Sequence, residues 1–195
     1  MRVVFAPLMI YPLKLETALV LTGLVLIAIH SLALWKAGAV QVWLRKFPRS
    51  KALGTFLLVV ATVWSWWLIK TIDLGEFSNW RPRLLVAIPI AAVLTWMYVE
   101  EFLAARALGM VALLAAEPLL EAAFLRPEST RLFLVILAYF WIGLAMFWIG
   151  MPYTLRDQIG WLVASPKRWR AAAFAGLAYG ALLLLLPATF AKTLP

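Results

Sequence analysis

The stretch LFLVILAYFWIGLAMFWIGM, residues 132–151, decides the fold of this chain of 195 residues. It contains no charged residue, and its length matches the roughly 20 residues that an α-helix needs to cross about 30 Å of hydrocarbon. Five other apolar runs have similar lengths, so the sequence predicts an integral membrane protein. The six runs are Thr17–Trp35, Ala52–Ile69, Leu84–Val99, Ala107–Leu125, Leu132–Met151 and Ala171–Ala191.

The composition favours helices over strands. Hydrophobic residues make up 65% of the chain and charged residues 14%, whereas a soluble domain has about 25% charged residues. In lipid, all backbone N–H and C=O groups must pair within the protein, which leaves helices or a closed barrel. Barrel strands alternate apolar and polar residues, and Leu182–Leu186 does not. We therefore expect an all-α, polytopic transmembrane helical bundle, one integral membrane domain over residues 1–195, with about six spans and short loops.

Two basic loops predict the orientation of the chain. Residues 36–51 carry five Lys or Arg and no acid, and residues 153–170 carry four with Asp157 as the single acid. The positive-inside rule places both loops on the cytoplasmic side, which requires an even number of spans between them. We expect a multi-pass protein of the cell membrane, of the bacterial inner-membrane type, with both loops cytoplasmic.

An even number of spans requires a helix break between Leu84 and Leu125. A single helix over this range would be about 63 Å long, twice the thickness of the bilayer core. We place the break near Glu100, Glu101 and Arg106, which gives six spans. Five spans with an additional interfacial helix is the alternative.

Two similar segments follow spans at an offset of 118 residues. Trp43–Arg49 (WLRKFPR) resembles Trp161–Lys167 (WLVASPK), and each has the composition of a basic amphipathic segment in the cytoplasmic interface. A duplicated two-helix unit and chance recurrence of an interfacial composition both explain the likeness. The net charge of +9 is divided among such short segments, so no continuous basic face for nucleic acid is expected.

Small residues predict close helix contacts. Ala172, Gly176 and Gly180 recur every four residues, a stripe that lets another helix approach closely. Gly143 and Gly150, seven residues apart, are expected to act in the same way. Such contacts form either within the bundle or between two copies of the chain.

Two carboxylates within an apolar run form a candidate ion site. Glu117 and Glu121 share one helix face, and Pro118 between them removes a backbone donor. An ionised carboxylate near mid-bilayer costs at least ~2.5–3.5 kcal/mol, so a compensating function is expected. We interpret the pair as a candidate ion or proton site, with Glu101 and Arg106 as further candidates. The alternative is a shorter span with both acids at the outer interface.

His30 is the one histidine of the chain and a candidate cofactor ligand. An imidazole inside the first run suits a haem or pigment, although a neutral histidine bonded to a neighbouring helix is the simpler interpretation. The chain has no cysteine, which removes thiolate metal sites and cysteine nucleophiles, and no metal site is predicted.

No motif assigns an activity. The chain lacks the phosphate-binding loop, the HExxH zinc motif and the GxSxG nucleophile motif, and its loops are too short for a soluble catalytic domain, so an enzyme is not expected. We favour an accessory or structural subunit of a larger membrane complex, whose partners are the lipid bilayer and other membrane-protein subunits and not nucleic acid. The alternatives are a small ion- or proton-coupled transporter that uses the glutamates, and a haem- or pigment-binding subunit that uses His30.

Overall fold

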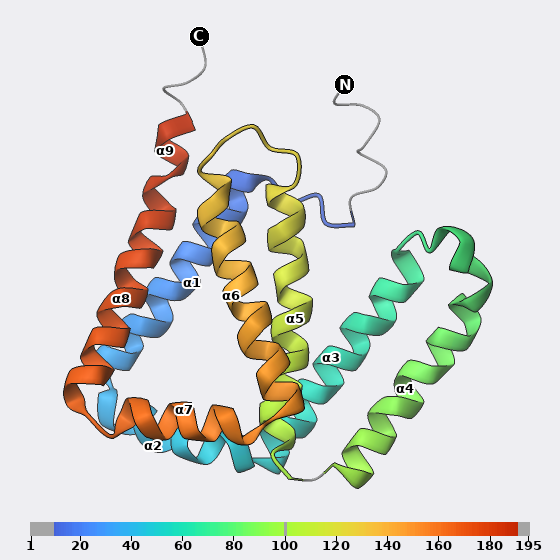
Figure 1. Ribbon diagram of the computed structural model, residues 1–195, viewed down its shortest axis with the longest axis horizontal. Coiled ribbons are helices and arrows are strands. Elements are labelled where there is room, and N and C mark those ends of the chain that lie inside the picture. Colours follow the sequence, from blue (N-terminus) through green and yellow to red (C-terminus); the bar gives the residue numbers. More distant parts are fainter. Residues whose placement is uncertain (1–9, 100, 191–195) are drawn as a thin grey trace.

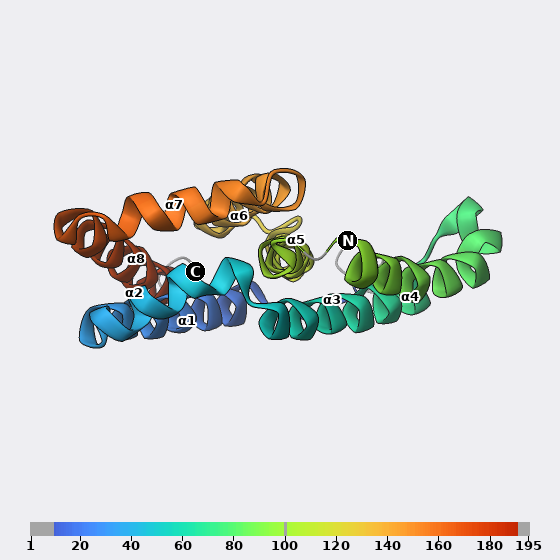
Figure 2. The same cartoon turned by 90° about the horizontal axis from the view of Figure 1, so that it is seen from below.

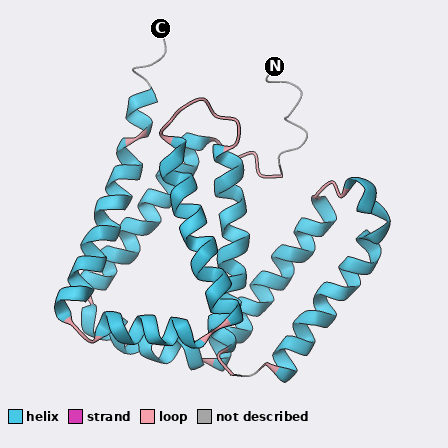
Figure 3. Cartoon of the chain, viewed as in Figure 1, coloured by secondary structure: helices cyan, strands magenta, loops and turns pink. Residues whose placement is uncertain are grey.

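The computed structural model describes residues 10–99 and 101–190, which form helices joined by short connections (Figures 1 and 3). Within these residues there is no strand. The long helices are α1 (Leu15–Trp35), α3 (Lys51–Thr71), α4 (Arg81–Tyr98), α5 (Leu103–Ala123), α6 (Arg131–Gly150) and α8 (Pro166–Leu185). The short elements are α2 (Ala37–Lys46), η2 (Phe47–Arg49), η3 (Gly75–Trp80), α7 (Tyr153–Val163) and α9 (Pro187–Phe190).

Each of the six apolar runs corresponds to one long helix. Four of these helices, α1, α3, α5 and α6, are long and apolar enough to cross a membrane. The other two begin with basic residues, α4 with Arg81 and Arg83, and α8 with three such residues in its first five positions. The structure is therefore an all-helical membrane-type fold with four candidate spans. The sixth run was expected to reach Ala191, which lies outside the described residues.

The helix break expected in the middle of the chain is present. Helix α4 ends at Tyr98 and α5 begins at Leu103. Phe102 precedes α5 in the left-handed region with φ 56°, which turns the chain into the second helix. Glu101 lies in this turn, whereas Glu100 is outside the described residues.

The long helices pack in pairs (Figures 1 and 2). Helix α1 packs chiefly against α8, α5 lies between α3 and α6, and α4 packs chiefly against α3. As a result the α3–α4 hairpin stands to one side of the other four long helices.

Two short helices lie across one end of the long helices. Helix α2 joins α1 to α3, and α7 joins α6 to α8, so the order long–short–long occurs twice in the chain. Helices α2 and α7 are in contact and run side by side across this end (Figures 1 and 2). Each contains the first part of one of the two similar segments singled out in the sequence, Trp43–Lys46 in α2 and Trp161–Val163 in α7. We call this end the α2/α7 end, and the other end the opposite end.

Clusters of buried side chains hold these parts together, and the two largest lie at the two ends. At the opposite end, α1, α5, α6 and α8 meet in a cluster that includes Leu19, Leu134 and Leu183, each fully buried. At the α2/α7 end, Phe47 of η2 packs with α5 and with Leu155 and Ile159 of α7. Burial of the apolar groups at the α2/α7 end fixes the short helices to the bundle.

Candidate functional site

The α1–α8 contact is built on the predicted glycines of α8. A Cβ atom added to Gly23 of α1 would lie 2.8 Å from the carbonyl oxygen of Gly180, so the two backbones are in direct contact there. A Cβ on Gly176 would overlap the His30 ring. The small residues of α8 thus face α1 within one chain.

The glycines of α6 have open surroundings, whereas two other glycines lie at helix contacts. Gly143 and Gly150 have no atom within 4 Å of an added Cβ. A Cβ on Gly109 would lie 2.8 Å from the Ala145 carbonyl oxygen. A Cβ on Gly54 would lie 2.8 Å from the backbone nitrogen of residue 104. The α5–α6 and α3–α5 contacts therefore use glycines that the sequence analysis missed, although Ala105 and Gly109 form a small-residue pair with the same spacing of four.

His30 is held between α1 and α8. Its Nδ1 lies 2.7 Å from the carbonyl oxygen of Leu26, and in the tautomer with hydrogen on Nδ1 this nitrogen donates to that oxygen. Its Nε2 edge packs against Gly176. Both ring nitrogens therefore face protein groups, and the suggested role as a cofactor ligand stays a prediction.

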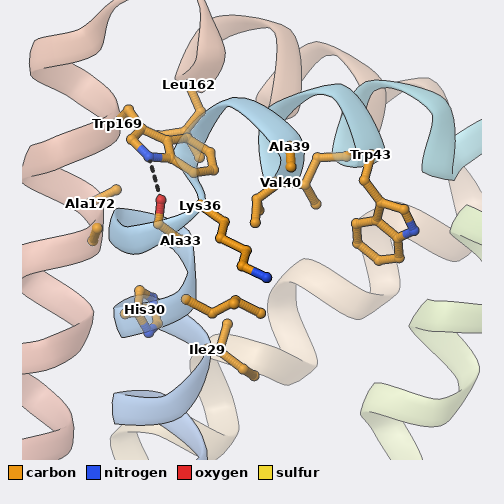
Figure 4. A pocket seen from close by; sticks show the side chains of 13 residues that line it. Ile29, His30, Ala33, Lys36, Ala39, Val40, Trp43, Leu162, Trp169 and Ala172 are labelled. Carbon is orange, nitrogen blue, oxygen red and sulfur yellow. Dashed lines mark hydrogen bonds between the residues drawn. The ribbon is translucent and has the colours of Figure 1, made fainter.

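An apolar cavity of about 740 Å³ lies where α1, α2, α7 and α8 meet (Figure 4). Trp169 closes one corner, because its side chain is only 5% exposed and its Nε1 donates to the carbonyl oxygen of Ala33 at 3.0 Å. The aliphatic chain of Lys36 runs across the cavity (Figure 4). The remaining lining is apolar apart from the edge of His30: Ile29, Leu32, Ala33, Ala39, Val40, Trp43, Leu44, Leu162, Trp169, Ala172 and Ala173.

A second cavity, of about 850 Å³, lies at the opposite end between α3, α5 and the start of the described chain. Three carboxylates line it, those of Asp73, Glu117 and Glu121, so we call it the acidic cavity. Glu121 is bonded to the backbone: its Oε1 accepts from the N–H of Ile10 at 2.5 Å and its Oε2 from the N–H of Tyr11 at 2.9 Å. These bonds attach the segment that precedes α1, which we call the entry segment, to helix α5.

Tyr11 joins this entry segment to α3. Its hydroxyl accepts a hydrogen bond of 2.6 Å from Trp64 Nε1, and its ring lies 5.5 Å from that of Trp67. Burial raises the pKa of the Tyr11 hydroxyl, the bond from Trp64 lowers it, and the charges of Glu117 and Glu121 raise it further. The phenol consequently stays protonated at neutral pH.

Glu117 differs from Glu121 in its bonding. It lies six residues before the end of α5, about 9 Å along the helix, and within residues 10–99 and 101–190 it makes no hydrogen bond. Helix α5 continues through Pro118, which lacks the N–H that would otherwise bond to the Leu114 carbonyl. Glu117 is thus the carboxylate of the predicted pair that lines the acidic cavity without a hydrogen bond among the described residues.

Arg106 is used inside the fold at the α2/α7 end. Its Nη1 donates to the carbonyl oxygen of Ile149 at 2.8 Å, in the last turn of α6, where carbonyls lack partners within the helix. Glu101 is exposed in the turn before α5, and the described part of the chain contains no ion pair between the two. The two candidates therefore lie near the same end without forming one site.

The fold and these sites define a helical membrane-type protein with an apolar cavity at one end and an acidic cavity at the other. Comparison with protein-family models, with curated proteins and with solved structures gives no match. Among the described side chains, no group of three His, Cys, Asp or Glu is placed to hold a metal ion.

Proposed function

We propose that this chain is an accessory or structural subunit of a larger membrane complex. The observation that carries the proposal is that several polar side chains that could act in catalysis or transport instead form hydrogen bonds that stabilise the fold. Glu121 binds two backbone N–H groups, Arg106 binds a helix-terminal carbonyl, and His30 bonds along α1 against α8. Pairing with backbone groups lowers the cost of these polar side chains in a membrane, so their bonds support a structural role.

The proposal includes six spans, with α4 and α8 also crossing the bilayer and the α2/α7 end in the cytoplasm. Helices of 18 and 20 residues are about 27 and 30 Å long. Their basic residues lie in the first turns, where long side chains extend to the headgroups. Arg83 lies over the Trp80 ring and Arg168 over the Trp161 ring, as is typical of residues at a membrane interface.

Helix α4 is the part of the chain on which we place the partner. It packs chiefly against α3, and none of its residues is buried. Val86, Ile90 and Met97 lie along one side of α4, and each is more than half exposed. A helix of a second membrane protein would complete the packing of this side.

Site-specific photo-crosslinking in native membranes tests the proposed subunit role. A photoreactive residue at Ile90 of α4 should give one adduct of defined mass, and the same partner should co-purify in constant ratio in mild detergent. A photoreactive residue at Phe174 of α8, which has similar exposure, serves as the control and should give no such adduct. A compact monomer that purifies alone, with no adduct from Ile90, would contradict the proposal.

A proton- or ion-coupled carrier is the second candidate, and Glu117 is the observation that favours it. This carboxylate lines the acidic cavity without a hydrogen bond from the rest of the described chain. We expect Glu117→Gln to abolish proton flux into proteoliposomes, whereas Glu76→Gln, which changes an exposed acid of η3, should leave flux unchanged. Equal flux in the two variants would remove Glu117 from the mechanism.

A further inference from the structure

Lys36 is an exposed residue that lines the apolar cavity, and no carboxylate balances its positive charge within the described residues. Its Nζ lies 5.0 Å from the centre of the Trp35 ring, and no acid pairs with it anywhere in residues 10–99 and 101–190. Figure 4 shows its side chain extended among the lining residues, between Ile29 and Trp43. An ammonium group beside apolar walls is stabilised by an anion.

The charges around the cavity also favour an anion. Arg45 and Lys46 end α2, and Lys167 and Arg168 begin α8. The nearby acid Asp157 is paired with Arg156 at 2.8 Å. The cavity therefore lies within a positively charged end of the chain.

The walls of the cavity suit a hydrocarbon chain. The volume of about 740 Å³ falls within the roughly 300–1,000 Å³ typical of sites for small molecules. Its aliphatic and aromatic lining comes from four helices, and the Trp169 indole N–H is already bonded to Ala33. A ligand that fills this space is therefore apolar along most of its length and anionic where it meets Lys36.

We propose that the apolar cavity binds one anionic phospholipid, with its phosphate at Lys36 Nζ and an acyl chain along the α1 and α8 walls. The α2/α7 end carries the short amphipathic helices, so a headgroup at Lys36 lies at the level where such helices contact the membrane surface. This site is separate from the acidic cavity and does not depend on the proposed subunit role.

Lipid binding to the purified full chain tests the proposal by native mass spectrometry. Phosphatidylglycerol should bind in one equivalent and more tightly than phosphatidylcholine with the same acyl chains. Lys36→Gln should weaken phosphatidylglycerol binding roughly fivefold, the effect of about 1 kcal/mol for one basic group at a lipid headgroup. Lys70→Gln, which changes an exposed lysine over a tryptophan ring at the opposite end, should have no effect, and Lys36→Arg should retain binding.

The acyl chain is tested separately. Ala172→Phe fills the wall of the cavity and should weaken phosphatidylglycerol binding while leaving Lys36 in place, whereas Ala178→Phe on exposed α8 surface outside the cavity should not. Glycerol 1-phosphate, which has no acyl chain, should bind far more weakly. Equal binding of the two phospholipids, equal effects of Lys36→Gln and Lys70→Gln, or tight binding of glycerol 1-phosphate would each overturn the proposal.

Discussion

Backbone meets backbone where Gly23 of α1 faces Gly180 of α8. The added Cβ at Gly23 would lie 2.8 Å from the Gly180 oxygen, and that at Gly180 would lie 3.0 Å from the Gly23 oxygen. Both neighbours are main-chain atoms, which cannot move aside as a side-chain end can. In lipid, such close packing replaces the hydrophobic effect as a source of helix association.

Gly23→Ala is therefore expected to destabilise the fold by about 1–3 kcal/mol, the typical cost of overpacking. In the matched variant Gly143→Ala the added Cβ meets no atom within 4 Å. This variant should therefore be neutral or should stabilise α6 by roughly 0.5–1 kcal/mol. Unfolding in mixed micelles would measure both effects. Similar stability of the two variants would show that α1 and α8 can separate without cost.

The sequence indicated part of this residue-level arrangement. The four-residue spacing of Gly176 and Gly180 shows a surface for close approach, but it does not show which helix approaches. The same spacing argument applied to Gly143 and Gly150 gave residues with open surroundings. Glycine permits contact between helices, and only the shapes of both helices determine whether contact forms.

Among the elements, α7 is held in position mainly by two buried side chains. Leu155 and Ile159 lie one turn apart on one face of α7 and are 6% and 7% exposed, packed with Phe47 of η2. The rest of this short helix is mostly exposed, and Trp161 is 60% exposed. A helix of 11 residues is not stable alone in water, so this packing decides its position.

Ile159→Ala should loosen α7 from η2 and α5, with a cost of about 2–4 kcal/mol for a buried truncation. Amide hydrogen exchange should increase over residues 153–163, while Trp161→Ala, a larger change on the exposed face, should leave exchange there unchanged. Unaltered exchange in Ile159→Ala would mean that α7 is held by the membrane surface alone.

At this scale the sequence was informative about where helices form and silent about how they pair. Runs of about 20 apolar residues are set by the thickness of the bilayer, so all six long helices could be expected. The ends of the first five agree with the predicted runs within about four residues, and those of α8 differ by five and six. The pairing of α1 with α8 could not, because a helix that is apolar on all sides has no polar face to mark its outer side. The bonding in the acidic cavity could not be predicted either, because nothing in the sequence indicates that Glu121 accepts hydrogen bonds from the N–H groups of Ile10 and Tyr11.

For the whole molecule, orientation is open to direct measurement because the chain has no cysteine. With six spans, Lys46→Cys, Glu101→Cys and Lys167→Cys should react with an impermeant maleimide from one side of the membrane. Asn79→Cys and Ser129→Cys, in exposed connections at the opposite end, should react from the other side. Reaction of residues 79 and 101 from the same side would show that α4 does not cross.

In the proposed six-span arrangement, helices α2 and α7, which lie across one end of the long helices, would also control the angle of the molecule to the bilayer. Tilting would drive one end of this crosswise pair, with Arg45 or Lys167 close by, into hydrocarbon while lifting the other end into water. Single helices adapt to thick or thin bilayers by leaning over. In the proposed arrangement the crosswise pair would hold this chain upright, so adaptation to bilayer thickness would fall on the lipids and connections at its opposite end.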